Sequence, residues 1–126
     1  MTVWLSRPIV LALHDELIAR YGGSDGLRDK GLLERALARP VNHAGSGNPD
    51  TAELGALYAI AIARNHPFID GNKCTGFGAL TLFLWLNGLQ LEAPEVEAVM
   101  IMLRLAADDI TDDDFTAWVR QHAQPP

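Results

Sequence analysis

The segment around Leu80 constrains the fold more than any other part of the chain. Leu80, Phe83 and Leu84 recur at helical spacing, and the helix they predict is apolar on nearly every side. Asp70-Gly71-Asn72 breaks the chain before this helix, and Gly88 supplies a stop after it. Because a helix that is apolar all round is usually buried, we expect it at the centre, with the other helices packed about it.

Five further segments carry apolar residues at the same spacing. Pro8 lies in the first turn of the predicted helix 7–21. Pro40 ends the predicted helix 29–40, because proline cannot continue the ladder of helical hydrogen bonds. Thr111 can cap the last. The predicted segments are 7–21, 29–40, 50–66, 94–103 and 111–119. Since no segment gives a convincing strand, the predicted fold class is all-α, a six-helix bundle around a central buried helix.

Residues 41–49 separate the second and third predicted helices. They contain Asn, His, Gly and Ser residues and no periodic apolar face, which is typical of an exposed loop or a small flap. Loops of this kind often carry recognition.

Length and composition limit the class of protein. A chain of 126 residues, 48% apolar and 21% charged, is expected to fold as one domain over residues 1–126. Its apolar runs are short and broken by charge, so we expect neither a membrane span nor a signal peptide, and predict a soluble cytoplasmic protein. Cys74 is the only cysteine, which excludes an internal disulfide.

The charge balance limits the partners. With 10 basic against 16 acidic residues the net charge is −6, so we expect no broad basic face and no direct contact with nucleic acid. We interpret the acidic cluster near the C-terminus as solvated loop and helix-start charges, because carboxylates suit helix N-termini. A metal site built from them is the alternative. The cluster consists of Asp108, Asp109, Asp112, Asp113 and Asp114.

Reactive side chains are concentrated between His66 and Thr75, directly before the central helix. The first turn of a helix presents unpaired N–H groups, so the backbone from Gly71 to Thr75 could hold a phosphate, with Lys73 adding a positive charge. Asp70 is a hard oxygen ligand suited to a phosphate-bound magnesium ion. His66 offers an imidazole, a side chain that suits a general base for a hydroxyl nucleophile.

Each of these residues also has a structural interpretation. Asp70 could be an N-cap, Asn72 a turn residue and Lys73 a solvated charge. Their coincidence within ten residues favours a phosphoryl or nucleotidyl transfer site, to which the Asn72 amide and the Thr75 hydroxyl would add polar contacts. Gly76 follows in the helix interior, where a glycine costs about 1 kcal/mol relative to alanine. Close packing or the approach of a ligand would explain why Gly76, and also Gly78, is a glycine.

The sequence His-Pro-Phe-Ile-Asp-Gly-Asn-Lys-x-Thr at 66–75 resembles the signature loop of the Fic/Doc family, most closely its Doc branch of death-on-curing toxins. Three further stretches resemble that branch: Leu13 to Asp15, Arg20 to Asp29, and Phe83 to Gly88. The similarity covers about residues 9–90.

The resemblance implies an enzyme that transfers part of a nucleoside triphosphate to a protein hydroxyl. The Doc branch resembles a kinase that uses ATP and Mg²⁺ to phosphorylate a threonine of elongation factor Tu, which stops translation in the bacterial cytoplasm. Such toxins are usually held inactive by a small Phd-like antitoxin, whose C-terminal helix lies in a groove on the toxin. The 41–49 loop would then help to dock the protein substrate.

The resemblance also implies roles for individual residues. His66 matches the base that activates the target hydroxyl, and Asp70 matches the magnesium-binding acid. Asn72 and Lys73 match phosphate-contacting positions. AMP-transferring relatives usually have glycine where this chain has Lys73, which favours phosphoryl transfer. AMP transfer and a non-catalytic antitoxin-binding module are the alternative functions.

Cys74 departs from the family pattern, which usually has arginine after Asn-Lys. A neutral thiol is a weak donor and cannot replace the planar fork of a guanidinium group. Losing one such contact commonly lowers a rate by roughly two to three orders of magnitude, so we expect weakened or absent activity. Three explanations are open: an inactivating change, which needs a single base substitution; a natural subgroup with altered chemistry; and a decayed toxin that only binds its antitoxin.

Overall fold

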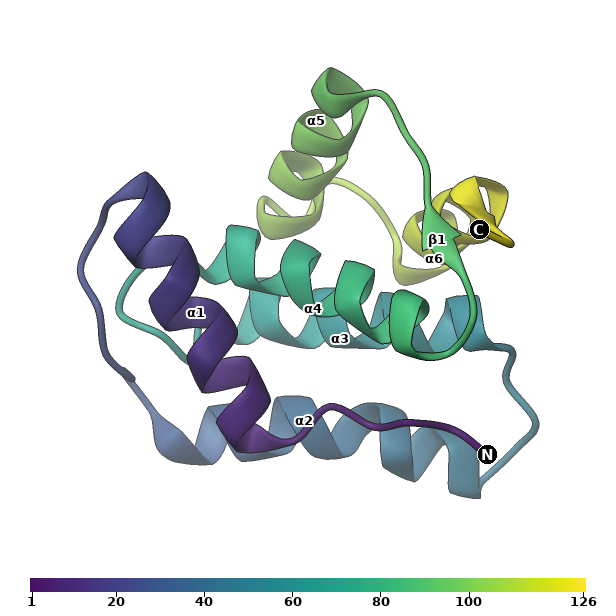
Figure 1. Ribbon diagram of the computed structural model, residues 1–126, viewed down its shortest axis with the longest axis horizontal. Helices are drawn as coiled ribbons and strands as arrows, with labels where there is room; N and C mark the ends of the chain where they lie inside the picture. The colour runs from purple at the N-terminus through teal and green to yellow at the C-terminus, as the bar shows by residue number, and fades with distance from the viewer.

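The computed structural model describes residues 1–126 and consists of six helices and a small two-stranded sheet (Figure 1). This confirms the predicted all-α class. None of the helices combines the length and the apolar character that a membrane span requires. In chain order the elements are α1 (Arg7–Tyr21), α2 (Lys30–Gly45), α3 (Thr51–Asn65), α4 (Asn72–Leu86), β1 (Gln90–Leu91), α5 (Glu95–Ala106), α6 (Asp112–His122) and β2 (Ala123–Gln124).

The predicted central helix exists, but α3 holds that position rather than α4. Helix α3 contacts α2, α4, α5 and α6, and eleven of its 15 residues are buried. Helix α4 lies beside it (Figure 1) and buries seven of 15 residues, while Trp85 at its far end is 57% exposed. The many alanines of α3 allow neighbours to approach from all sides, whereas the bulky side chains of α4 fill one side and leave the other partly open.

Glycines allow α4 to pack closely on both of its neighbours. A Cβ atom on Gly76 would lie 3.1 Å from the carbonyl oxygen of Ala59 in α3, and a Cβ on Gly78 would lie 3.2 Å from the Leu13 side chain in α1. Close packing therefore explains both helix-interior glycines, and the approach of a ligand is not needed for either.

The prediction that Pro40 ends the second helix is wrong, because α2 continues to Gly45. Proline removes the hydrogen bond to residue 36, but Pro40 is itself buried, and Leu33, Ala36 and Pro40 form one face against α3. Side chains on both sides of the proline also make ion pairs, Arg39 with Asp112 at 3.2 Å and His43 with Glu53. Tertiary contacts thus outweigh the local cost of the proline.

The prediction of an exposed loop or flap over 41–49 fails for its first five residues, which belong to α2. Only Ser46 to Asp50 connect α2 to α3. His43, expected in the loop, lies in the last turn of α2.

The two strands are a further difference from the sequence-based expectation. β1 and β2 pair antiparallel, with Gln90 opposite Gln124 and Leu91 opposite Ala123. They join the segment after α4 to the segment after α6. Two-residue strands carry no periodic pattern, so this pairing depends on the fold that brings the segments together.

Candidate functional site

The predicted site forms a tight connection between α3 and α4. Helix α3 ends at Asn65, and His66 turns the chain in the left-handed conformation, with φ 52° and ψ 56°. Pro67 and Phe68 then enter the interior, while the His66 side chain stays exposed. The result is an exposed imidazole directly before two buried residues, while Ile69 and Asp70 return to the surface.

The N-terminus of α4 has no side-chain cap. Its N-cap is Gly71, with φ 76°, and the first helical hydrogen bond runs from the Thr75 N–H to the Gly71 carbonyl at 2.9 Å. The peptide N–H groups of Asn72, Lys73 and Cys74 donate to no protein acceptor. By contrast, aspartate or threonine side chains cap α2, α3 and α6. The start of α4 therefore keeps the free donors that an anion can accept.

Asp70 lies beside these donors and is held by backbone groups. Its Oδ1 accepts from the Gly71 N–H at 2.9 Å, and its Oδ2 from the Ser24 N–H at 3.3 Å. The loop after α1 approaches so closely that a Cβ on Gly23 would lie 2.7 Å from Asp70 Oδ2. No lysine or arginine pairs with this exposed carboxylate, so its charge and remaining lone pairs are available.

Two predicted site residues direct their side chains elsewhere. The Asn72 amide donates to the Phe68 carbonyl at 3.0 Å and accepts from the Phe68 N–H at 2.9 Å, so it closes the loop. The Thr75 hydroxyl is 0% exposed and has no hydrogen-bond partner. Both side chains are therefore buried, and Asn72 can contribute only its free backbone N–H to an anion site at the surface.

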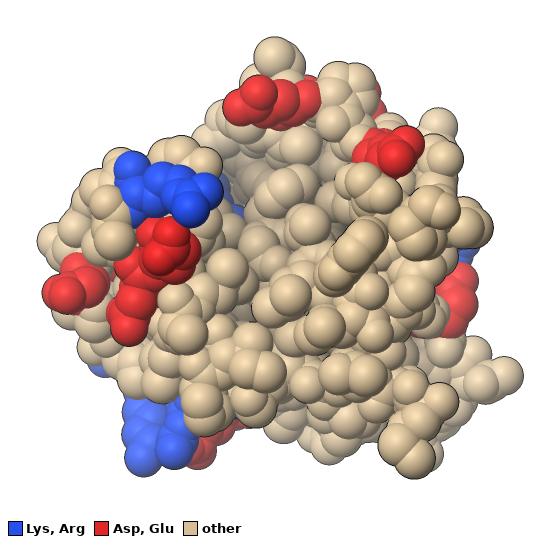
Figure 2. Space-filling view, viewed as in Figure 1, with Lys and Arg blue, Asp and Glu red and all other residues tan.

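Lys73 and Cys74 are exposed and lie at the mouth of an apolar groove of about 500 Å³ between α1, α4 and α5. Figure 2 shows this hollow as a largely uncharged surface with charged residues only around its rim. The walls are mainly apolar and include Leu17, Tyr21, Phe77, Val99, Met102 and Leu103. The reactive loop and the groove therefore share one face of the molecule.

Two side chains that the sequence did not single out as site residues hold the loop in place. Arg28 donates from Nε to the His66 carbonyl at 2.7 Å and from Nη2 to the Asn65 carbonyl at 2.9 Å. His14 is buried and lies 2.8 Å from the Asp70 carbonyl. Both belong to stretches that resemble the Doc pattern, but nothing in their local sequence indicates carbonyl contacts with the loop.

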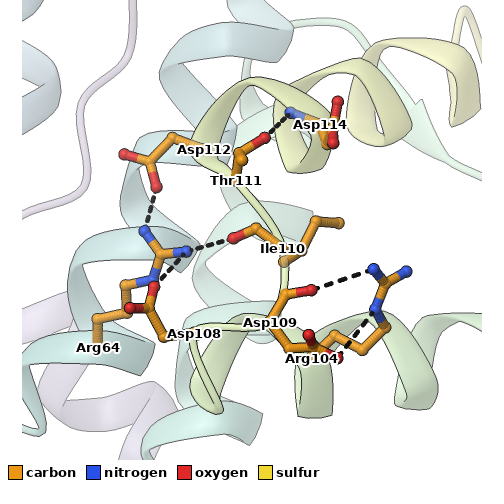
Figure 3. A pocket seen from close by; sticks show the side chains of 8 residues that line it. All are labelled: Arg64, Arg104, Asp108, Asp109, Ile110, Thr111, Asp112 and Asp114. Carbon is orange, nitrogen blue, oxygen red and sulfur yellow. Dashed lines mark hydrogen bonds and ion pairs between the residues drawn. The ribbon is translucent and has the colours of Figure 1, made fainter.

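The C-terminal acidic cluster is structural. Arg64 pairs with Asp112 and with Asp108, the latter at 3.4 Å, and donates to the Ile110 carbonyl at 2.7 Å (Figure 3). Arg104 donates to the Asp109 carbonyl at 3.1 Å. Asp112, Asp113 and Asp114 lie in the first turn of α6, as the helix-start interpretation predicts, but Asp108 and Asp112 pair with Arg64. No three His, Cys, Asp or Glu side chains lie where they could hold a metal ion together.

Comparison with known proteins identifies the family of this chain. Residues 4–84 match the model of the Fic/DOC family. The chain is 40% identical over 89 residues to "Protein kinase doc" of Escherichia phage P1, covering 69% of this chain and 71% of that protein. It is 38% identical over 95 residues to "Toxin Doc" of Mycolicibacterium smegmatis, covering 74% and 71%.

Proposed function

Because this chain belongs to the Fic/Doc family, we propose that it is a Doc-type toxin, a kinase that transfers a phosphoryl group from ATP to a threonine hydroxyl of elongation factor Tu. One observation carries the proposal: an exposed imidazole, a carboxylate without a cationic partner and three free peptide N–H groups share one loop. This set provides a base, a metal ligand and an anion site, which phosphoryl transfer requires together.

In this proposal each group of the loop has one task. The free N–H groups at the start of α4 and the Lys73 ammonium hold the transferred phosphate. His66 accepts the proton of the target hydroxyl while the hydroxyl oxygen forms its bond to the γ-phosphorus and the bond to the ADP oxygen breaks. Arg28 keeps His66 at the end of α3 through its backbone carbonyl.

The donor set suits a magnesium ion that arrives with the nucleotide. Mg²⁺ prefers one or two carboxylates, with phosphate oxygens and water completing its octahedron. Asp70 supplies one carboxylate, whose two hydrogen bonds come from peptide N–H groups. When bound, the ion would neutralise charge on the phosphates and on the departing ADP.

Cys74 sets the expected activity of this chain. It is exposed beside Lys73, at the position where the family usually has arginine, and a thiol cannot supply a bidentate charged contact. We expect weak or absent transfer, and a gain of about 100-fold or more when arginine is restored.

The experiment compares purified protein with its Cys74→Arg variant, using ATP, Mg²⁺ and elongation factor Tu. Phosphorylation of a threonine, seen as a mass gain of one phosphate and abolished by His66→Ala in the same background, supports the proposal. A mass gain of AMP contradicts phosphoryl transfer and favours the AMP-transferring alternative. No modification by the folded arginine variant overturns the proposed catalytic function.

A second candidate function, antitoxin binding without catalysis, is favoured by the apolar groove. The groove does not need an arginine at position 74 for its apolar walls, and α5 presents four exposed apolar side chains at helical spacing, of which Val99 and Leu103 line the groove and Val96 and Met100 extend the apolar surface. We propose this surface as the site for the C-terminal helix of a Phd-like antitoxin. Val99→Glu should weaken binding of such a peptide at least tenfold, whereas Val41→Glu, an exposed control on α2, should not.

A further inference from the structure

His14 is a buried titratable side chain that the proposed chemistry does not use. It lies in α1, is 1% exposed, and stacks on Phe68 with ring centroids 3.8 Å apart and an interplanar angle of 7°. Its Nε2 atom is 2.8 Å from the carbonyl oxygen of Asp70. Because a carbonyl oxygen only accepts hydrogen bonds, Nε2 must carry the hydrogen. The neutral Nε2–H tautomer and the imidazolium both provide this donor, so the contact does not depend on charge.

The group that His14 holds is the peptide between Asp70 and Gly71. The carbonyl of this peptide faces His14, and its N–H donates to Asp70 Oδ1 at 2.9 Å. Gly71 has φ +76°, and glycine allows the preceding peptide to rotate with little steric resistance. Rotation would remove the N–H from the Asp70 carboxylate and turn a carbonyl oxygen away from α1.

The surroundings fix the His14 ring in the position this contact needs. Phe68 covers one face of the ring and is itself held at both backbone groups by the Asn72 amide. The ring also lies beside Gly71, where a Cβ would be in van der Waals contact with His14 Nε2 at 3.6 Å and closer still, at 3.1 Å, to Ile18 Cδ1. The loop thus contacts α1 through a ring that cannot easily change its rotamer.

We propose that His14 is a positioning residue whose Nε2–H locks the Asp70–Gly71 peptide and thereby fixes the Asp70 carboxylate beside the free N–H groups of α4. The effect on transfer rests on the proposed function, whereas the effect on the peptide does not. The other hydrogen-bond donors to the Asp70 side chain and to the Gly71 carbonyl are backbone N–H groups, and Ile18 of α1 packs beside Gly71 without a polar group, so His14 is the side chain of α1 that can hold this peptide by a hydrogen bond.

Two substitutions separate the hydrogen bond from packing. His14→Phe keeps a ring that can stack on Phe68 but has no donor, and His14→Gln can place an amide N–H near the position of Nε2. In the Phe variant we expect the Gly71 amide to exchange its hydrogen about tenfold faster. With arginine at position 74, kcat should fall at least tenfold in the Phe variant, with the KM for elongation factor Tu unchanged. The Gln variant should recover most of both losses.

The outcomes distinguish this inference from the proposed function. Unchanged Gly71 exchange in a folded Phe variant, or a Gln variant as defective as Phe, overturns the positioning role. If the parent protein transfers nothing, the proposed function fails, and Gly71 exchange still decides the inference. If neither variant folds, nitrogen NMR of the His14 ring in the unmodified protein decides it: an Nε2-bound hydrogen supports the lock, and a neutral ring with hydrogen on Nδ1 only overturns it.

Discussion

The starts of α3 and α4 each have an aspartate beside the first turn, yet the two carboxylates have different partners. Asp50 caps α3 by accepting from the Glu53 N–H at 2.8 Å, and Arg120 pairs with it at 2.8 Å. The hydrogen bond from Arg120 lowers the pKa of Asp50 despite an opposing contribution from burial. Asp70 instead contacts two peptide N–H groups and no cation, and α4 has no side-chain cap. The same residue type therefore closes one helix and leaves the other open to an anion.

The largest expected effect separates the two aspartates directly. With arginine at position 74, Asp70→Asn should lower phosphoryl transfer about 100- to 1,000-fold, because the metal ligand loses its charge. The free energy of unfolding of the Asp70→Asn variant should change by less than about 1 kcal/mol, because the hydrogen bonds of Asp70 with the Gly71 and Ser24 N–H groups are exposed. Initial rates and urea unfolding measure both effects.

Asp50→Asn is the matched control, because asparagine is also a good N-cap. It should leave the transfer rate unchanged. A loss of transfer in the Asp50 variant, or unchanged transfer in the Asp70 variant, would contradict the functional difference between the capped start of α3 and the uncapped start of α4.

The next effect tests the loop that presents Asp70. Asn72→Ala leaves the N–H and the carbonyl of Phe68 without partners in a buried position, at a cost of about 2–4 kcal/mol in the free energy of unfolding. Asn87→Ala is the control, because Asn87 holds both backbone groups of Val3 in the same way at the far end of α4. Both variants should be less stable, but only the Asn72 variant should lose transfer activity. Equal activity in the two would show that the loop geometry is not needed.

A smaller effect is expected where the loop after α1 meets Asp70. Gly23 has φ +115°, and Gly23→Ala would place a Cβ 2.7 Å from Asp70 Oδ2, for a cost of about 1–3 kcal/mol together with displacement of the carboxylate. Gly22→Ala has comparable backbone strain, with φ +88°, but meets no atom within 4 Å. Thermal unfolding should report strain in both, and reduced transfer only in the Gly23 variant. Normal transfer in that variant would mean that Asp70 can move without consequence.

The sequence predicted the parts of this comparison that depend on local patterns. The predicted cap Thr111 is confirmed, and the predicted segments that begin at 29 and 50 begin at the observed caps Asp29 and Asp50. Capping is a contact between near neighbours in the chain, so these helix starts are visible in the local sequence. The sequence also placed the reactive loop at the start of α4.

What the sequence could not predict depends on distant contacts. Helix α2 passes Pro40 because its buried face continues against α3, and α3 rather than α4 is central because packing on all sides decides burial. The contacts of Arg28 and His14 likewise join segments up to 56 residues apart. The Asn72 amide contacts Phe68 only four residues away, but its inward direction depends on the burial of this loop in the fold. The roles assigned to His66, Asp70 and Lys73 remain predictions.

The smallest expected effect concerns the Asp50–Arg120 ion pair at the start of α3 and the dependence of its stabilising effect on pH. Because Arg120 lowers the pKa of Asp50 in the folded protein, this ion pair stabilises the fold above the ordinary value of 3.8 and is lost as the pH falls through the lower folded pKa. Both side chains are about half exposed, so Arg120→Gln should cost only about 0.2–1 kcal/mol at pH 7. The difference in the free energy of unfolding between this variant and the parent should shrink towards zero below the pKa of Asp50 in the folded protein, as followed by urea unfolding across this pH range.

Asp50→Asn combined with Arg120→Gln should lower the free energy of unfolding little more than either single change, since the two variants remove the same pair. A difference that stays constant down to low pH would show that Arg120 stabilises α3 through packing, and the contrast with Asp70 would then rest on capping alone.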